Sequence, residues 1–285
     1  MKKTLRILLP FLVGLAVAEL MNITVGWWGF WVIFPWIGFS ISIGNLLRRV
    51  LKGRKRLIGR KIAILMVLPC LLLFVPIVNH ENFQLGGVFL LILVGFFGKG
   101  VIHYAVAKIF GPLIWGRGFC GWACWTGAIL DWLPITGKKK DIPEKAKNLR
   151  YISLAISLAI PIYLIFVMNY NIYEDYLNKM EMIWMFAGNA LYYAIGIPLA
   201  FIYKDKRAFC KLVCPVGLVM KPQTRVAIIK IKPKKENDCI ECGACNKICP
   251  MDIDVMSYIK NKKPITNTEC ILCSDCRIVC PVNAI

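Results

Sequence analysis

The chain has few acidic residues and almost no histidine. It holds 16 Asp and Glu residues against 36 Lys and Arg residues, and 2 histidines among 285 residues. No C-x-x-C-H segment for covalent haem attachment occurs, and His80 and His103 fall near opposite ends of two predicted membrane spans. Two histidines placed in this way cannot bind one iron from both sides, so the sequence argues against a haem protein.

Motifs for nucleotide chemistry and for hydrolysis are also missing. No Walker motif occurs, no G-x-G-x-x-G lies between a predicted strand and helix, and no set of nucleophile, base and orienting residue is recognisable. A formal net charge of +20 would suggest a nucleic-acid partner in a soluble protein. Here the basic residues stand in loops between apolar runs. This pattern indicates membrane topology and contact with anionic lipid, so we expect no nucleic-acid partner.

Long apolar runs dominate the first three quarters of the chain. Hydrophobic residues make up 58% of the sequence, and the mean hydropathy is +0.61. Six runs are predicted to cross the membrane as helices, at residues 6–23, 26–47, 61–79, 83–108, 151–169 and 182–203. Glycines and prolines interrupt the second run, so one span followed by a re-entrant segment is an alternative to a complete N-terminal hairpin.

The distribution of charge among the loops predicts the orientation in the membrane. The segments 48–61 and 138–150 are rich in Lys and Arg, whereas the loops on the opposite side hold acidic residues such as Glu81 and Glu174. Positively charged loops stay in the cytoplasm. We therefore expect a multi-pass protein of the cytoplasmic (inner) membrane, with both termini and the C-terminal segment in the cytoplasm.

The C-terminal segment carries eight cysteines in two runs of identical spacing. Both runs read C-x2-C-x2-C-x3-C-P, one from Cys239 to Pro250 and the other from Cys270 to Pro281. In bacterial-type ferredoxins, three cysteines of such a run bind one [4Fe–4S] cluster and the fourth binds the other cluster. The predicted ligands are Cys239, Cys242, Cys245 and Cys280 for cluster 1, and Cys249, Cys270, Cys273 and Cys276 for cluster 2. Two complete copies, each with its proline, argue against a zinc site or a disulfide scaffold.

A second pair of cysteine motifs follows two of the predicted spans. Segments Arg117–Gly127 and Arg207–Gly217 both read R-x-F-C-x3-C-x2-G, an internal repeat with a period of about 90 residues. Cysteines four residues apart lie on one face of a helical turn. Two such turns facing each other would bring together four thiols, those of Cys120, Cys124, Cys210 and Cys214. The sequence leaves open whether these thiols bind iron, bind another metal, act as a thiol redox site, or only close a cytoplasmic cap.

Two ionisable residues inside the fourth predicted span are candidates for a quinone site. Lys99 and His103 are four residues apart, on one helical face and toward the cytoplasmic end. Ionisable residues inside a membrane are often functional, and histidine can transfer a proton near neutral pH. The alternative is a lysine that reaches the interface and a histidine that is satisfied by the backbone.

The combination of these motifs resembles the membrane-bound, ferredoxin-type quinol dehydrogenases of the NapH-like group. It also resembles their relatives in nitrous-oxide reductase maturation and copper-oxidase assembly. The resemblance covers roughly residues 60 to 285, and Cys210, Cys214 and Pro215 match the C-x3-C-P pattern of these proteins, whereas Trp125 replaces the proline of the first motif. The resemblance implies electron exchange between the membrane quinone pool and a redox partner.

We therefore predict a mainly α membrane protein with a small α+β ferredoxin domain that binds two [4Fe–4S] clusters. The predicted parts are an N-terminal hairpin and basic loop (1–60), a four-helix core with both C-x3-C motifs (61–229), and the ferredoxin domain (230–285). The predicted function is that of an electron-transfer oxidoreductase subunit of the quinol dehydrogenase type, and the basic cytoplasmic face predicts an acidic redox partner. The alternatives are an assembly factor that supplies electrons to a metal centre and a passive membrane anchor for a larger oxidoreductase.

Overall fold

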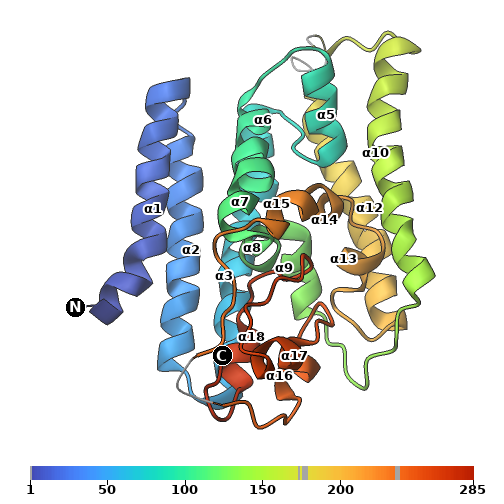
Figure 1. The fold of residues 1–285 in the computed structure, drawn as a ribbon. Helices are drawn as coiled ribbons and strands as arrows, with labels where there is room; N and C mark the ends of the chain where they lie inside the picture. Colours follow the sequence, from blue (N-terminus) through green and yellow to red (C-terminus); the bar gives the residue numbers. More distant parts are fainter. Residues whose placement is uncertain (1, 173, 175–178, 235–237) are drawn as a thin grey trace.

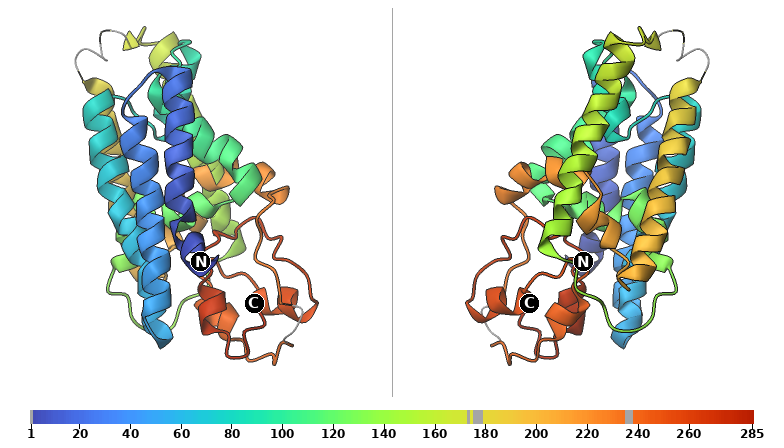
Figure 2. Two further views of the ribbon diagram at one scale, coloured as in Figure 1. Left: turned by 90° about the vertical axis from the view of Figure 1, so that its left-hand side faces the viewer. Right: turned by 90° about the vertical axis from the view of Figure 1, so that its right-hand side faces the viewer.

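A computed structural model describes residues 2–172, 174, 179–234 and 238–285 of the chain (Figure 1). All regular secondary structure in this part is helical. The long helices stand side by side, and the C-terminal segment lies at one end of them (Figures 1 and 2). The predicted mainly α class is confirmed.

The N-terminal part forms a complete hairpin. Its two helices are α1 (Lys2–Val25) and α2 (Phe30–Val50). Glycine lets their backbones approach closely, because a Cβ at Gly14 would lie 2.5 Å from Phe34 O and a Cβ at Gly38 would overlap Pro10 O. These glycines therefore allow α1 and α2 to pack closely, and α2 is one continuous helix instead of a re-entrant segment.

The rest of the bundle contains three further long helical runs. The first joins η1 (Gly53–Leu57), α3 (Ile58–Pro69), the π-helical turn η2 (Cys70–Phe74) and α4 (Val75–Asn79). The other two are α10 (Leu149–Phe166) and α12 (Met180–Ile202). Five stretches of the described residues are long and apolar enough to cross a membrane: Ile7–Val25, Phe30–Val50, Gly53–Asn79, Glu144–Phe166 and Met180–Ile202. This composition is that of a membrane protein.

The fourth predicted span, 83–108, is interrupted, so the described chain has five long spans and one broken helix instead of six spans. It forms α5 (Leu85–Leu93) and then a second run of α6 (Lys99–Tyr104), the π-helical η3 (Ala105–Phe110) and α7 (Gly111–Trp115). Gly95 turns the chain between them with a φ of +71°. The buried carboxylate of Glu81 then accepts a hydrogen bond from Gly100 N (2.5 Å) at the start of α6. A capped helix start inside an apolar run ends the span early.

Short helices form the end of the bundle next to the C-terminal segment. They are α8 (Gly118–Trp122), α9 (Trp125–Trp132), η4 (Glu144–Asn148), α13 (Ala208–Leu212), α14 (Val216–Val219) and α15 (Lys221–Arg225). The C-terminal segment itself contains α16 (Ala244–Ile248), α17 (Val255–Lys260) and α18 (Asp275–Val279). This arrangement places both C-x3-C motifs, which start at α8 and α13, between the long helices and the predicted cluster ligands.

The predicted α+β character of the C-terminal domain differs from what the structure shows, because no described residue there forms a strand. Isolated backbone hydrogen bonds take the place of a sheet. Ile265 N donates to Ile231 O, and Lys234 N donates to Ala284 O, both at 2.9 Å. Loops that wrap around cysteines leave too few consecutive residues for a longer ladder of hydrogen bonds.

Candidate functional site

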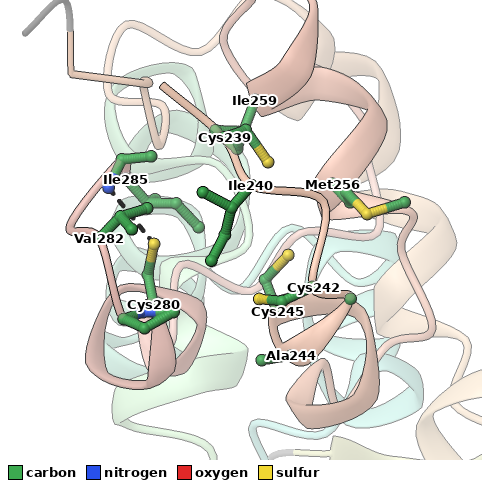
Figure 3. Close-up of a pocket in the computed structure, with 13 residues that line it drawn as sticks. Cys239, Ile240, Cys242, Ala244, Cys245, Met256, Ile259, Cys280, Val282 and Ile285 are labelled. Atoms are coloured by element: carbon green, nitrogen blue, oxygen red, sulfur yellow. Dashed lines mark hydrogen bonds between the residues drawn. The ribbon is translucent and has the colours of Figure 1, made fainter. Parts of the chain in front are cut away.

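The four thiols predicted for cluster 1 line one cavity of the C-terminal segment (Figure 3). Cys239 and Cys242 come from the loop that leads into α16, Cys245 lies in the first turn of α16, and Cys280 directly follows α18. Apolar side chains, among them Ile259, complete the wall. Cys242 is exposed whereas Cys245 is buried, so this site lies at the surface of the protein.

The four thiols predicted for cluster 2 form a second, more buried group. Cys273 and Cys276 are buried, and Cys249 and Cys270 are half-buried. Burial, and after it the nearby thiols of Cys270 and Cys249, together raise the pKa of Cys276 to about 12. Thiols that influence one another in this way lie close together. The crossover pattern of the sequence is thus present in the fold, with one cysteine of each run placed beside three of the other.

The donor type of both groups is that of an iron–sulfur cluster. Each group offers four cysteine thiols. Clusters of the [4Fe–4S] type are held by four cysteine thiolates. Both groups of thiols therefore suit such a cluster.

The two C-x3-C motifs meet and form a third group of four thiols. Cys120 and Cys210 are buried, and Cys124 and Cys214 are half-buried. Burial, and after it the neighbouring thiols of Cys210, Cys120 and Cys124, together raise the pKa of Cys214 to about 12. Burial likewise raises the pKa of Cys124 to about 12, with Cys120 and Cys210 as neighbours. The structure thus brings together the four cysteines that the internal repeat singled out.

The arginine side chain of each motif contacts the glycine of the other motif. A Cβ at Gly127 would overlap the guanidinium of Arg207, and a Cβ at Gly217 would lie 2.9 Å from Nη2 of Arg117. Arg207 also donates from Nη1 to Cys120 O at 3.1 Å. Both arginines are almost fully buried. The equal spacing between the Arg and the Gly in the two copies of the repeat therefore lets each arginine contact the glycine of the other copy.

A buried lysine, which the sequence analysis did not single out, lies beside this third group. Lys108 of η3 is 3% exposed, and its ammonium lies over the rings of Tyr104 (4.2 Å), Trp125 (4.6 Å) and Phe119 (5.4 Å). Cation–π contacts of this kind stabilise a desolvated charge. Lys108, together with Arg117 and Arg207, surrounds the four thiols with positive charge, which favours an anionic occupant. A charged residue within an apolar run was the available signal.

The two candidate quinone residues lie in the interrupted helix but face different surroundings. The ammonium of Lys99 lies over the ring of Trp27 at 5.3 Å. His103 is 3% exposed and lies near the rings of Phe34 (5.9 Å) and Phe83 (6.0 Å), without a hydrogen-bond partner for either ring nitrogen among the described residues. The structure therefore places His103 in an apolar core and Lys99 against an aromatic ring of the N-terminal hairpin.

Comparison with known proteins bears on all three groups of thiols. The family model described as a 4Fe-4S dicluster domain matches residues 238–285. A second model, described as a 4Fe-4S binding domain, matches residues 104–143 and 186–235, which contain the two C-x3-C motifs. The uncharacterized protein MJ0749 of Methanocaldococcus jannaschii is 30% identical over 182 residues, which cover 60% of this chain and 70% of that protein. The chain belongs to the same family as this archaeal protein.

Two further relatives have names that refer to electron transport. The putative electron transport protein YccM of Escherichia coli is 28% identical over 54% of this chain and 47% of its own length. The methylamine utilization ferredoxin-type protein MauN of Paracoccus denitrificans is 26% identical over 50% of this chain and 51% of its own. The chain thus spans about half of each of these two relatives, and no solved structure matches it. Together with the domain matches, these findings confirm an iron–sulfur electron-transfer protein of ferredoxin type.

Proposed function

We propose that this protein passes electrons between the membrane quinone pool and a redox partner, as the resemblance to the NapH-like group implies. The observation that carries the proposal is the arrangement of twelve cysteines in three groups of four between the membrane helices and the protein surface. A [4Fe–4S] cluster in such a group supplies one-electron transfer. The protein residues supply spacing, burial and charge.

The proposed ligands follow the three groups. Cys239, Cys242, Cys245 and Cys280 hold cluster 1, and Cys249, Cys270, Cys273 and Cys276 hold cluster 2. Cys120, Cys124, Cys210 and Cys214 hold a third [4Fe–4S] cluster. Support for the third comes from the match of both motif segments to a 4Fe-4S binding domain and from the buried cations Lys108, Arg117 and Arg207. These cations offset the negative charge that four thiolates bring into a site shielded from water.

Lys99 and His103 remain the proposed contacts for the quinone head group. Both stand in the helical run of α6 and η3, which begins at Lys99 and contains Lys108 beside the third group of thiols. A quinone head group bound beside α6 would be separated from the proposed third cluster by η3 alone. An interrupted helix also supplies polar groups within the apolar part of the protein, which a quinone oxygen needs.

The proposed location is the inner membrane, with the ferredoxin segment in the cytoplasm. Support comes from the basic segments 48–61 and 138–150, which lie at the same end of the bundle as the C-terminal segment (Figure 1). Exposed lysines such as Lys247 and Lys263 lie on the ferredoxin segment itself. An acidic redox partner would therefore be attracted to this end, and its association would weaken with added salt.

Reoxidation of the reduced clusters by a quinone analogue tests this function. We expect full-length protein, reduced anaerobically with dithionite, to be reoxidised rapidly when the analogue is added. A Cys120→Ser/Cys210→Ser variant should react much more slowly, because loss of the proposed third cluster leaves a longer distance for the electron to cross. Absorption at the iron–sulfur bands gives the rates.

A Cys70→Ser variant is the matched control for that experiment. Cys70 is a buried thiol of η2 and belongs to none of the three groups, so its replacement should leave the rate unchanged. Equal and slow reoxidation in all three proteins would contradict exchange with quinone. That outcome would instead favour the assembly factor, which delivers electrons to a metal centre during biogenesis.

A further inference from the structure

The C-terminal segment contacts the membrane part through the loop that carries Cys270, Cys273 and Cys276. A Cβ at Gly121, one residue after Cys120, would overlap the carbonyl oxygen of Ile271. The indole nitrogen of Trp122 donates to Leu272 O at 3.1 Å. The backbone of the first C-x3-C motif therefore lies directly against the backbone of the loop from Ile271 to Cys273, with no side chain between them.

Two carboxylates beside the ligands of cluster 2 are held by cations of the membrane part. Glu269 precedes Cys270 and pairs with Arg117, with Arg150 (3.0 Å) and with Lys221 (3.0 Å). The carboxylate of Glu269 thus bridges three cations from three different helical elements of the membrane part, at the N-cap of α8, in α10 and in α15.

The second carboxylate, Asp275, precedes Cys276. It pairs with Arg48 at 2.6 Å and lies 3.5 Å from Nε of Arg60. Arg48 also donates from Nη2 to Cys273 O at 2.8 Å, and its guanidinium lies over the ring of Trp122 at 4.8 Å. The ion pairs of Glu269 and Asp275 thus hold both ends of the segment that contains Cys270 and Cys273.

The second motif holds the same group of thiols from the other side. Lys211 follows Cys210 as Gly121 follows Cys120, so the two residues are equivalent in the internal repeat. Its ammonium pairs with Asp252, three residues after Cys249, and with Asp205 at 2.5 Å. Residues from both motifs therefore contact loops that carry proposed ligands of cluster 2. The proposed ligands of cluster 1 include the exposed Cys242 and line a different cavity.

We infer that the contact between Gly121 and Ile271 is the place where an electron crosses between the proposed third cluster and cluster 2. This inference rests on the proposed function and makes Gly121 and Glu269 positioning residues for it. In the crossing, one centre loses one electron and the other gains it, and no bond forms or breaks. Cluster 1 is then the outermost cluster, and it exchanges electrons with the external partner.

A Gly121→Ala variant tests the crossing. The added Cβ meets backbone, which cannot rotate away, so the loop from Ile271 to Cys273 must move outward. We expect the iron content to be unchanged and the magnetic coupling between the two neighbouring reduced clusters, seen by EPR, to decrease. Electron transfer between them should slow severalfold, because the rate of electron tunnelling falls as the distance between the two clusters grows.

The same substitution at Gly196 is the matched control. A Cβ there would lie 3.4 Å from Phe209, an ordinary contact, so Gly196→Ala should keep both the coupling and the rate. Unchanged coupling in Gly121→Ala would overturn the inference.

A second variant covers the case in which Gly121→Ala fails to fold. Glu269→Gln removes the charge that Arg117, Arg150 and Lys221 hold and adds no bulk, so it should weaken the same coupling with all clusters present. Unchanged coupling in this variant would also contradict the inference. Wild-type protein with only two clusters would instead contradict the proposed third cluster, so the two failures are distinguishable.

Discussion

Replacing Asp131 with alanine is expected to destabilise the protein more than most single changes. Asp131 of α9 is 3% exposed, and its carboxylate accepts hydrogen bonds from Arg60 at 2.7 Å and from Arg207 at 2.6 and 3.0 Å. Its removal leaves two buried guanidinium groups without their main counter-charge, which typically costs about 3–5 kcal/mol. Because Arg207 also holds Gly127 and Cys120 O in place, the third group of thiols should loosen as well.

Denaturant unfolding in detergent measures this loss. Asp141→Ala is a suitable control, because Asp141 is exposed and its replacement should change the free energy of unfolding by no more than about 0.5 kcal/mol. A loss of about 1 kcal/mol or less in Asp131→Ala would mean that the carboxylate does not hold the two arginines in solution.

The same carboxylate predicts how stability responds to acid. Burial alone would raise the pKa of Asp131, but the charges of Arg207 and Arg60 and their hydrogen bonds lower it to about 2 from an ordinary value of 3.8. A group with a lowered pKa in the folded state stabilises the fold above its ordinary pKa. This contribution is therefore complete at neutral pH, and it disappears as the pH falls from about 4 through 2.

Serine variants of the two ferredoxin clusters are expected to have opposite effects on electron transfer from the membrane. Cys276 is buried in the group that contacts the C-x3-C motifs, whereas Cys242 is exposed in the outer group. Loss of cluster 2 in Cys276→Ser should stop the exchange between the quinone analogue and cluster 1. Loss of cluster 1 in Cys242→Ser should leave the exchange with cluster 2 in place. The order of the groups in the structure predicts this difference.

EPR spectra of samples frozen at intervals after the quinone analogue is added distinguish the two variants. Each variant retains one ferredoxin cluster, whose signal reports whether it is still connected to the membrane part. Wild-type protein provides the reference rate. If cluster 1 is reoxidised in Cys276→Ser as fast as in wild type, the linear order is wrong and the exposed cluster reaches quinone by another path.

The sequence predicted three groups of cysteines from the spacing of the motifs. In a run of ferredoxin type, three closely spaced cysteines bind one cluster and the fourth binds the other, so the spacing alone predicts the grouping. The internal repeat predicted that Cys120, Cys124, Cys210 and Cys214 meet, and they do. Apolar run length also predicted five of the six spans, the two helices of the N-terminal hairpin and three others, because this signal is local in the chain.

The interrupted helix and the contacts between the motifs were not predictable in this way. Hydropathy summed over residues 83–108 does not register the turn at Gly95, or the carboxylate of Glu81 that reaches the start of α6. The contact between Gly121 and Ile271 joins residues 150 positions apart, and the sequence offers no signal for it beyond a glycine inside the motif. Such contacts depend on how the elements pack, which no local pattern contains.

The number of clusters in the purified chain tests the central claim most directly, that three groups of four thiols each hold a [4Fe–4S] cluster. Full-length protein would be purified anaerobically, and iron and acid-labile sulfide would be determined per chain, with Mössbauer spectra to identify the cluster type. Three clusters predict about twelve irons per chain, all in the cubane form. About eight irons, with the C-x3-C thiols free to react, would contradict the third cluster and leave the membrane part without a centre to relay electrons.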